Sequence, residues 1–221
     1  MQSRADVKDP RLDGRSELER LLKASRYGSI PQAVASLAIF SHPSTVQQCS
    51  GSAVFRIVRG KASSERGQET TASDGLPAML DDNTGPTDTF LWSNGIGRNA
   101  CCDVQFCHLW QRSSDPRCYT NLANICILPS FLAKLSDTHE EVVRLLRLRA
   151  FELYAWKPND AQTPDTADGL GVTWAECLPP TGDLATSLRS ALLHNPKSRT
   201  TASARQFGWL FSDWKLDSSL S

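Results

Sequence analysis

The chain lacks the sequence signatures of several large enzyme classes. Its 221 residues contain no glycine-rich phosphate loop ending in Lys-Ser or Lys-Thr, no Gly-x-Gly-x-x-Gly after a predicted strand, no Gly-x-Ser-x-Gly and no His-Glu-x-x-His. These motifs build a phosphate cradle, an activated nucleophile or a zinc site. Their absence disfavours nucleotide-driven enzymes, serine hydrolases and zinc proteases.

The chain also has no net charge and no long apolar run. Lys and Arg number 24, and Asp and Glu number 24, so the protein as a whole does not attract a polyanion and a nucleic-acid site has to be a local basic patch. No apolar stretch approaches the ~20 residues that a membrane-spanning helix needs. The first residues, MQSRADVKDPRLDGRSE, lack the apolar segment of an export signal. We therefore expect no membrane association and a cytoplasmic location.

The seven cysteines are odd in number and include no Cys-x-x-Cys pair. This pattern argues against a disulfide framework and fits a reducing compartment, where buried free thiols pack as small hydrophobic side chains. A zinc site is the alternative for four of them, although their spacings match no common zinc knuckle. Those four residues are Cys101, Cys102, Cys107 and Cys118.

Composition and periodicity predict an α+β fold. A hydrophobic content of 40% and a charged content of 22% are ordinary for a soluble globular domain, and 221 residues suffice for a sizeable core. We expect mostly helices around a small antiparallel sheet. Residues 1–60 are predicted to form a scaffold of helices and a strand, residues 61–75 a polar surface loop or seam, and residues 76–221 the part that carries the functional site, all within one globular unit.

Capping patterns and apolar spacing locate several elements along the chain. The β-branched and aromatic content of residues 53–58 predicts a strand. Two capping boxes and two single caps predict helix starts. Helices are expected from Glu17 after the Ser16 cap, after a Thr87 cap, after a Thr138 cap to about Tyr154, and after Asp183. Leu184, Leu188 and Leu192 after Asp183 are spaced by four, and Phe207, Leu210, Phe211 and Trp214 also have helical spacing.

One stretch, residues 103–141, orders a strand, an irregular loop, a second strand and a helix. Alternation along residues 103–110 puts Val104 and His108 on one face, so the imidazole closes the first strand beside the loop. Histidine has an ordinary pKa near ~6.5 and can take a proton from water at neutral pH. Asn124, in the second strand segment NLANICIL, can hold that imidazole or the backbone beside it.

This order, with His108 at the end of the first strand and Asn124 in the second, resembles the HNH family of His-Me finger nucleases over about residues 103–139. The resemblance implies that His108 is the general base, that Asn124 orients it, and that the chain hydrolyses phosphodiester bonds of nucleic acid, DNA rather than RNA. It also implies one divalent cation, magnesium or manganese, which polarises the scissile phosphate and stabilises the leaving oxygen.

The chain departs from the family pattern at two cation-binding positions. Cys107 stands before the histidine, where the family often has an acidic residue or a histidine, and Ala133 stands where the helix should supply a ligand. Magnesium prefers hard oxygen ligands to sulfur. The nearby side chains that remain to hold a cation are Asp103, Asp137 and His139. The alternative is a catalytically inactive binding or interaction module that keeps the fold of the finger.

Basic residues after the finger predict a local nucleic-acid patch. If they cluster in space they neutralise phosphates, and binding then depends strongly on salt. The alternative is a solvated helix face, on which Glu140 and Arg144 form an i,i+4 pair of small effect. The candidates are Arg144, Arg147 and Arg149 in the predicted helix and Lys197, Arg199 and Arg205 in the Ser/Thr-rich segment near the C-terminus.

The finger residues also have ordinary structural explanations. His108 can be a partly buried histidine that is bonded to a nearby carbonyl oxygen. Asn121 and Asn124 can serve in turns and caps, where the side chain bonds neighbouring backbone. His139 can be a first-turn helix residue.

Overall fold

The structure is a computed structural model that describes residues 13–169 and 171–210. Helix accounts for 45% and strand for 12% of it, in small sheets among several helices, which confirms the α+β class. Within these residues no helix is both long enough and apolar enough to cross a bilayer. The elements are α1 (Gly14–Lys23), α2 (Ile30–Leu37), α3 (Pro43–Gln47), β1 (Ile57–Arg59), η2 (Ser63–Glu65), β2 (Glu69–Thr71), β3 (Pro77–Asp81), α4 (Thr84–Ser93), η3 (Arg98–Ala100), β4 (Val104–His108), η4 (Leu122–Asn124), β5 (Ile125–Pro129), α5 (Ser130–Ala133), α6 (Leu135–Thr138), α7 (Glu140–Tyr154), η5 (Thr166–Gly169), α8 (Leu184–His194) and α9 (Arg199–Phe207).

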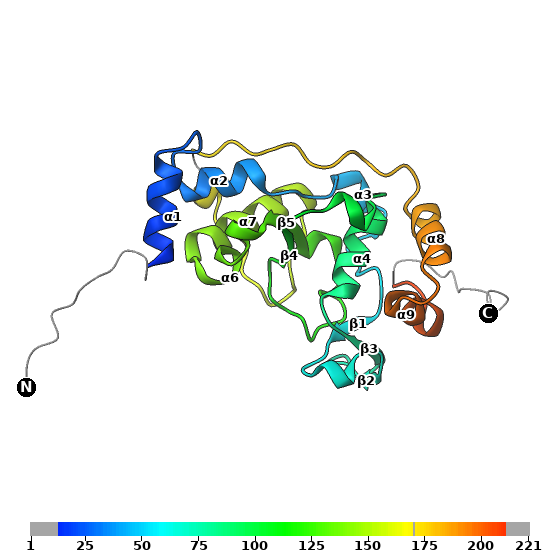
Figure 1. The fold of residues 1–221 in the computed structure, drawn as a ribbon. Helices are drawn as coiled ribbons and strands as arrows, with labels where there is room; N and C mark the ends of the chain where they lie inside the picture. Colours follow the sequence, from blue (N-terminus) through cyan, green and yellow to red (C-terminus); the bar gives the residue numbers. More distant parts are fainter. Residues whose placement is uncertain (1–12, 170, 211–221) are drawn as a thin grey trace, which may run out of the picture.

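The hairpin of β4 and β5 lies in the middle of the molecule (Figure 1). Its strands are antiparallel, with His108 opposite Ile125 at the end next to the loop. Ile125 and Ile127 pack into one hydrophobic cluster. Cys126 and Leu128, which point to the other face, pack into a second cluster. Because both faces of β5 are buried, its sequence is apolar without alternation.

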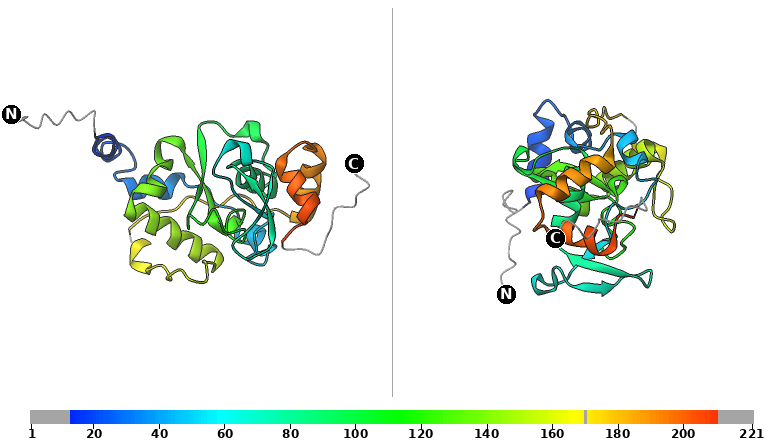
Figure 2. Two further views of the ribbon diagram at one scale, coloured as in Figure 1. Left: turned by 90° about the horizontal axis from the view of Figure 1, so that it is seen from below. Right: turned by 90° about the vertical axis from the view of Figure 1, so that its right-hand side faces the viewer.

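The two hydrophobic clusters connect the hairpin to two groups of helices. One cluster contains Leu22 of α1, Val34 of α2 and Leu146 of α7. The other contains Phe90 of α4 and Leu188 of α8. The molecule is accordingly elongated, with α1 at one end and α8 and α9 at the other (Figure 2).

An extended segment before α8 runs along one edge of the molecule and joins these two ends (Figure 1). It has little regular structure of its own, yet its backbone is bonded to the N-terminal part of the chain. Ala175 N donates to Ala35 O at 3.0 Å, and Leu178 N donates to Phe40 O at 2.9 Å. These bonds satisfy backbone groups that a bare loop would leave to water.

Three further strands form a small mixed sheet in the order β1-β3-β2. The parallel pairing of β1 with β3 joins residues 1–60 to residues 76–221. Residues 61–75, which were predicted to be a loop or seam, instead contain η2 and the edge strand β2. Their polar composition reflects the exposure of this edge strand, because an edge strand needs no apolar residues on its solvent side.

Two helices begin earlier than the capping patterns predict. The cap of α1 is Asp13, whose side chain accepts a hydrogen bond from Ser16 N at 3.1 Å, so Ser16 is not the cap. Helix α4 begins at Thr84 rather than after Thr87, with Pro86 in its first turn. Proline is tolerated there because the first N–H groups of a helix have no intrahelical partner.

The C-terminal half contains both helices that were predicted there and adds α9. Helix α7 ends at Tyr154 as predicted, although its N-cap is His139 rather than Thr138. The side chain of Asp183 caps α8 as predicted, and the three leucines spaced by four residues in that helix are buried. Helix α9 ends at Phe207. The predicted helical positions of Phe211 and Trp214 lie outside the described residues.

Candidate functional site

His108 lines a cavity of about 430 Å³ where β4 meets the following loop. The walls come from β1, the turn before α4, the edge of β4, the loop, and α5 with α6. Among the residues predicted for catalysis or cation binding, the cavity brings His108 together with Asp137. The complete lining is Arg59, Asn83, Gln105, Phe106, Cys107, His108, Gln111, Ser113, Ala133, Lys134, Ser136 and Asp137.

The loop holds the imidazole of His108 in one orientation. Its Nε2 lies 2.9 Å from the carbonyl oxygen of Tyr119, and the two rings stack at a centroid distance of 4.9 Å and an angle of 12°. A carbonyl oxygen only accepts, so Nε2 carries the proton and Nδ1 keeps the lone pair. Burial lowers the pKa of His108 although this hydrogen bond opposes the effect. The ring is therefore neutral at pH 7 and able to accept a proton.

Asn124 is fully buried and braces the loop. Its Oδ1 accepts a hydrogen bond from Trp110 N at 2.9 Å, and its Nδ2 donates to Cys118 O at 2.9 Å. Cys118 directly precedes Tyr119, whose carbonyl oxygen holds His108. Asn124 therefore does not bond the imidazole, and any effect on its orientation acts through the loop backbone.

The three residues predicted to hold a cation do not meet. Asp103 precedes β4 at the end away from His108, about 16 Å from it at ~3.3 Å per residue. His139 lines a different hollow, which is formed by α1, the start of α2 and the start of α7. Asp137 alone lines the His108 cavity, where its Oδ1 accepts a hydrogen bond from Gln111 Nε2 at 3.2 Å.

The donor set does not fit a preformed site for magnesium or manganese. Cys107 and Ala133, at the two positions where a ligand would be expected, are both buried. Within residues 13–169 and 171–210, no three or more His, Cys, Asp or Glu side chains are grouped to hold a metal ion. The four cysteines considered for zinc therefore form no such group either.

Two cations that the sequence analysis did not single out line the His108 cavity. Arg59 ends β1, and Lys134 lies between α5 and α6. Besides burial, the positive charge of Arg59 lowers the pKa of His108 and the negative charge of Asp137 raises it, so both groups act on the ring. Arg59 pairs with β3 and its backbone N–H donates to Ser113 O of the loop at 2.8 Å, and the sequence contains no signal for these long-range contacts.

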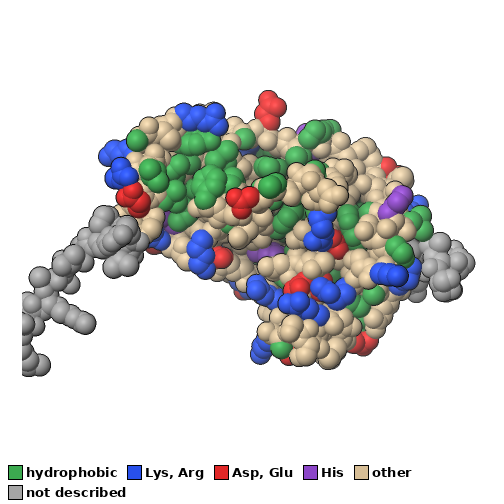
Figure 3. Space-filling view, in the orientation of Figure 1, with side chains coloured by type: hydrophobic (Ala, Val, Ile, Leu, Met, Phe, Trp, Pro, Cys, Tyr) green, Lys and Arg blue, Asp and Glu red, His purple; other side chains and the backbone are tan. Residues whose placement is uncertain are grey.

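A second hollow of about 410 Å³ shares Arg59 with the His108 cavity. Arg66 and Arg98 line it, and each forms an ion pair, Arg66 with Asp82 and Arg98 with Asp88. Figure 3 shows Lys and Arg side chains gathered over the lower part of this face, around the three-stranded sheet. We call the cationic residues of the cavity and the hollow the basic track: Arg59, Arg66, Arg98 and Lys134.

The three arginines predicted on α7 all have partners within the protein. The guanidinium of Arg147 lies 4.9 Å from the ring centroid of Trp110, and that of Arg149 lies 5.3 Å from the ring centroid of Trp174. Arg144 forms an ion pair with the glutamate one turn earlier, at 2.7 Å. Stacking on indoles explains two of the three without a ligand.

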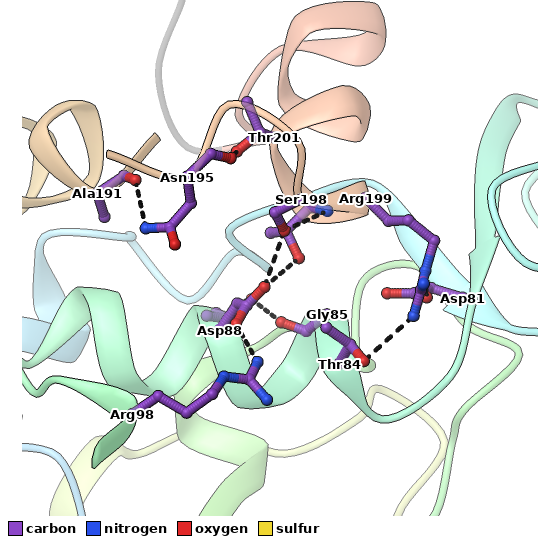
Figure 4. A network of polar contacts seen from close by, with 12 residues as sticks. Asp81, Thr84, Gly85, Asp88, Arg98, Ala191, Asn195, Ser198, Arg199 and Thr201 are labelled. Carbon is purple, nitrogen blue, oxygen red and sulfur yellow. Dashed lines mark hydrogen bonds and ion pairs between the residues drawn. The ribbon is translucent and has the colours of Figure 1, made fainter. Parts of the chain in front are cut away.

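The other three predicted basic residues, Lys197, Arg199 and Arg205, lie just before or on α9, on the far side of the hairpin from α7 (Figure 1). Arg199 bonds the buried carboxylate of Asp81 (Figure 4). Its Nη2 also lies 3.2 Å from Asp82 Oδ1. It therefore docks α9 on the turn between β3 and α4. The six predicted residues do not form one patch.

Another cavity, of about 620 Å³, lies across the loop from His108. Gln111 and Ser113 line the His108 cavity, whereas Arg112 between them lines the large one. Lys157 and Trp156 also line the large cavity. Its lining also includes Asp115 and Asp160, and Asp160 forms an ion pair with Arg112 at 2.8 Å, so the cavity carries charges of both signs beside an aromatic face.

Comparison with known proteins adds no family to this geometry. No protein-family model matches the chain, and neither a curated protein nor a solved structure matches it. The HNH resemblance is thus neither supported nor opposed, and a function has to be argued from the His108 cavity itself.

Proposed function

We propose that the chain hydrolyses phosphodiester bonds of nucleic acid as an HNH-like endonuclease, with His108 as the general base. The observation that carries this proposal is the neutral imidazole whose Nε2–H is tied to the Tyr119 carbonyl oxygen while its ring lines a polar cavity. A base of this kind needs a free ring nitrogen and a fixed orientation. The hydrogen bond to Tyr119 and the stacked rings support a fixed orientation, and Nδ1 is the ring nitrogen left to act as the base.

In the proposed reaction Nδ1 of His108 removes a proton from the attacking water. Arg59 and Lys134 neutralise the phosphate and stabilise the negative charge that grows on it in the transition state. Arg66 and Arg98 of the basic track bind neighbouring phosphates. Because only one carboxylate lines the cavity, no step is assigned to a divalent cation. Duplex DNA is the substrate that we favour.

The test compares wild type with His108→Gln on plasmid DNA, single-stranded DNA and RNA, each with magnesium, manganese or EDTA. Glutamine retains an amide donor for the Tyr119 carbonyl oxygen but cannot act as a base, so cleavage should fall by about 10²-fold or more. His194→Gln is the matched control, because that exposed histidine ends α8 and bonds its own helix. Equal cleavage by His108→Gln, or no cleavage by wild type on any substrate, would refute the proposal.

The second candidate is a nucleic-acid-binding module without catalytic activity. Two observations favour it. Cys107 and Ala133 are buried at the expected ligand positions, and Arg112 and Lys157 line the cavity of about 620 Å³. Binding should then survive both His108→Gln and EDTA, and it should weaken steeply with salt. Arg112→Ala combined with Lys157→Ala should reduce binding, whereas loss of binding in EDTA would rule this candidate out.

A further inference from the structure

Two cysteines face each other across the central hairpin. Cys107 of β4 lies directly opposite Cys126 of β5, and both are free thiols. Leu109 N donates to Asn124 O at 3.0 Å, so Leu109 and Asn124 form a hydrogen-bonded pair of the ladder. Such pairs alternate with non-bonded ones, which makes Cys107 and Cys126 a hydrogen-bonded pair with Cα atoms about 5.5 Å apart. This separation falls within the range of about 4.4–6.8 Å that a disulfide requires.

The two thiols differ in access and in acidity. Cys107 lines the His108 cavity with 7% of its surface exposed, whereas Cys126 has 0% exposed. Contact with the Cys126 thiol is the main cause that lowers the pKa of Cys107, and burial opposes it. The same contact with Cys107, together with burial, raises the pKa of Cys126. Cys107 is therefore the thiol of the pair that a reagent in the cavity reaches and that loses its proton more readily.

We propose that Cys107 and Cys126 form an oxidisable thiol pair, which a hydroperoxide such as hydrogen peroxide converts into a cross-strand disulfide. The sulfur of Cys107 attacks one peroxide oxygen, the O–O bond breaks, and the departing hydroxide takes a proton to leave as water. The Cys107 sulfenic acid is then attacked by the sulfur of Cys126, whose proton leaves with the hydroxyl group as a second water. Each sulfur loses one electron and the peroxide gains two.

The remaining buried thiols are less suited to this chemistry. Burial raises the pKa of both Cys49 and Cys118 to about 12, so neither forms a thiolate near neutral pH. Cys102 is exposed and Cys177 is partly exposed, so reagents reach them, but neither lies opposite a second cysteine in a strand pair. The pairing of the two strands therefore predicts that peroxide links Cys107 to Cys126 in preference to the other cysteines.

The disulfide would link the two ends of the segment that contains the loop between β4 and β5. Residues 107–126 include Tyr119, whose carbonyl oxygen holds His108. A cross-link between ends that are already adjacent restrains the unfolded chain more than the folded one. We expect the oxidised protein to unfold at a higher temperature than the reduced protein, and dithiothreitol to reverse the shift.

The experiment treats reduced full-length protein with hydrogen peroxide, blocks remaining thiols with iodoacetamide under denaturing conditions, and maps the peptides by mass spectrometry. A linked peptide containing Cys107 and Cys126, lighter by two hydrogens than the sum of its reduced parts, supports the proposal. Cys126→Ser should halt the reaction at a Cys107 sulfenic acid that dimedone traps. Cys177→Ser is the control and should form the same link as wild type.

The proposal is overturned if Cys107 and Cys126 remain fully alkylated after peroxide treatment, or if peroxide links other cysteines first. The mapping of wild type suffices for this decision if Cys126→Ser does not fold. Neither result depends on nuclease activity, because the readout is the covalent state of the hairpin. Failure of the hydrolysis proposal would therefore leave this one intact.

Discussion

Replacing Arg199 by methionine should destabilise the protein strongly although the residue lies near the surface. Its guanidinium bonds the carboxylate of Asp81, which has 0% exposure (Figure 4). It also bonds Asp82. Oδ2 of Asp81 has no hydrogen-bond partner among the described residues, so Arg199 is the main compensation for that buried charge. Methionine keeps the length and apolar character of the stem but removes the charge.

The size of the effect follows from burial. Removing one partner of a buried ion pair costs about 3–5 kcal/mol, because the other charge stays buried and unpaired. The Arg199 side chain is 37% exposed, so water reaches the vacated space and the cost falls toward the lower limit, about 3 kcal/mol. For a domain of this length that corresponds to a decrease in Tm of about 6–12 °C.

The pH dependence identifies the cause. Burial raises the pKa of Asp81, and the hydrogen bond and charge of Arg199 oppose that rise. In Arg199→Met the pKa of Asp81 should rise further, so the folded state binds a proton more readily than the unfolded one. The loss of stability is then complete at neutral pH and shrinks as the pH falls toward the unfolded value of ~3.9.

Urea denaturation at several pH values measures this effect. Adding Asp81→Asn to Arg199→Met should restore part of the stability and remove the pH dependence. Lys197→Met is the matched control, an exposed cation just before α9 that should change stability by less than ~0.5 kcal/mol. A cost below ~1 kcal/mol for Arg199→Met, or no rescue by Asp81→Asn, would show that the pair does not hold α9 in place.

Two further predictions concern the hairpin loop. Asn124→Ala leaves Trp110 N–H and Cys118 C=O without their hydrogen-bond partner. Unfolding measurements should therefore show a decrease in the free energy of unfolding on the order of 3 kcal/mol. A decrease below ~1 kcal/mol would mean that water replaces the amide. Burial lowers the pKa of His108, so its contribution to stability is full above about pH 6.5 and is lost as the pH falls from there through the lower folded pKa. His108→Gln should flatten that part of the stability profile in urea titrations, and an unchanged slope would place the titrating group elsewhere.

The sequence by itself determined those features that depend on near neighbours in the chain. Strand alternation and the apolar run from Ile125 to Leu128 were sufficient to locate β4, β5 and the His108 position at the strand end. The Asp183 cap and the leucine spacing were sufficient for α8. Each of these features reflects hydrogen bonds and side-chain directions within a few residues, which the order of residue types determines.

Helix starts were less predictable because several side chains compete for the same free N–H groups. Asp13 and Ser16 both suit a cap, and the short carboxylate of Asp13 takes the position. Pro86 suggests a break, although a first turn accepts it. Residues 61–75 form part of a sheet only because β3 offers an edge to which β2 can pair.

Tertiary structure alone decided which charged residues meet. Arg59 and Lys134 reach His108, and Arg199 reaches Asp81, because the two hydrophobic clusters bring together segments far apart in the chain. The same packing separates Asp103 and His139 from the cavity. The sequence gives only the residue type of a charged side chain. Whether that charge binds a ligand or stabilises the fold depends on its partner and its burial, which the tertiary structure determines.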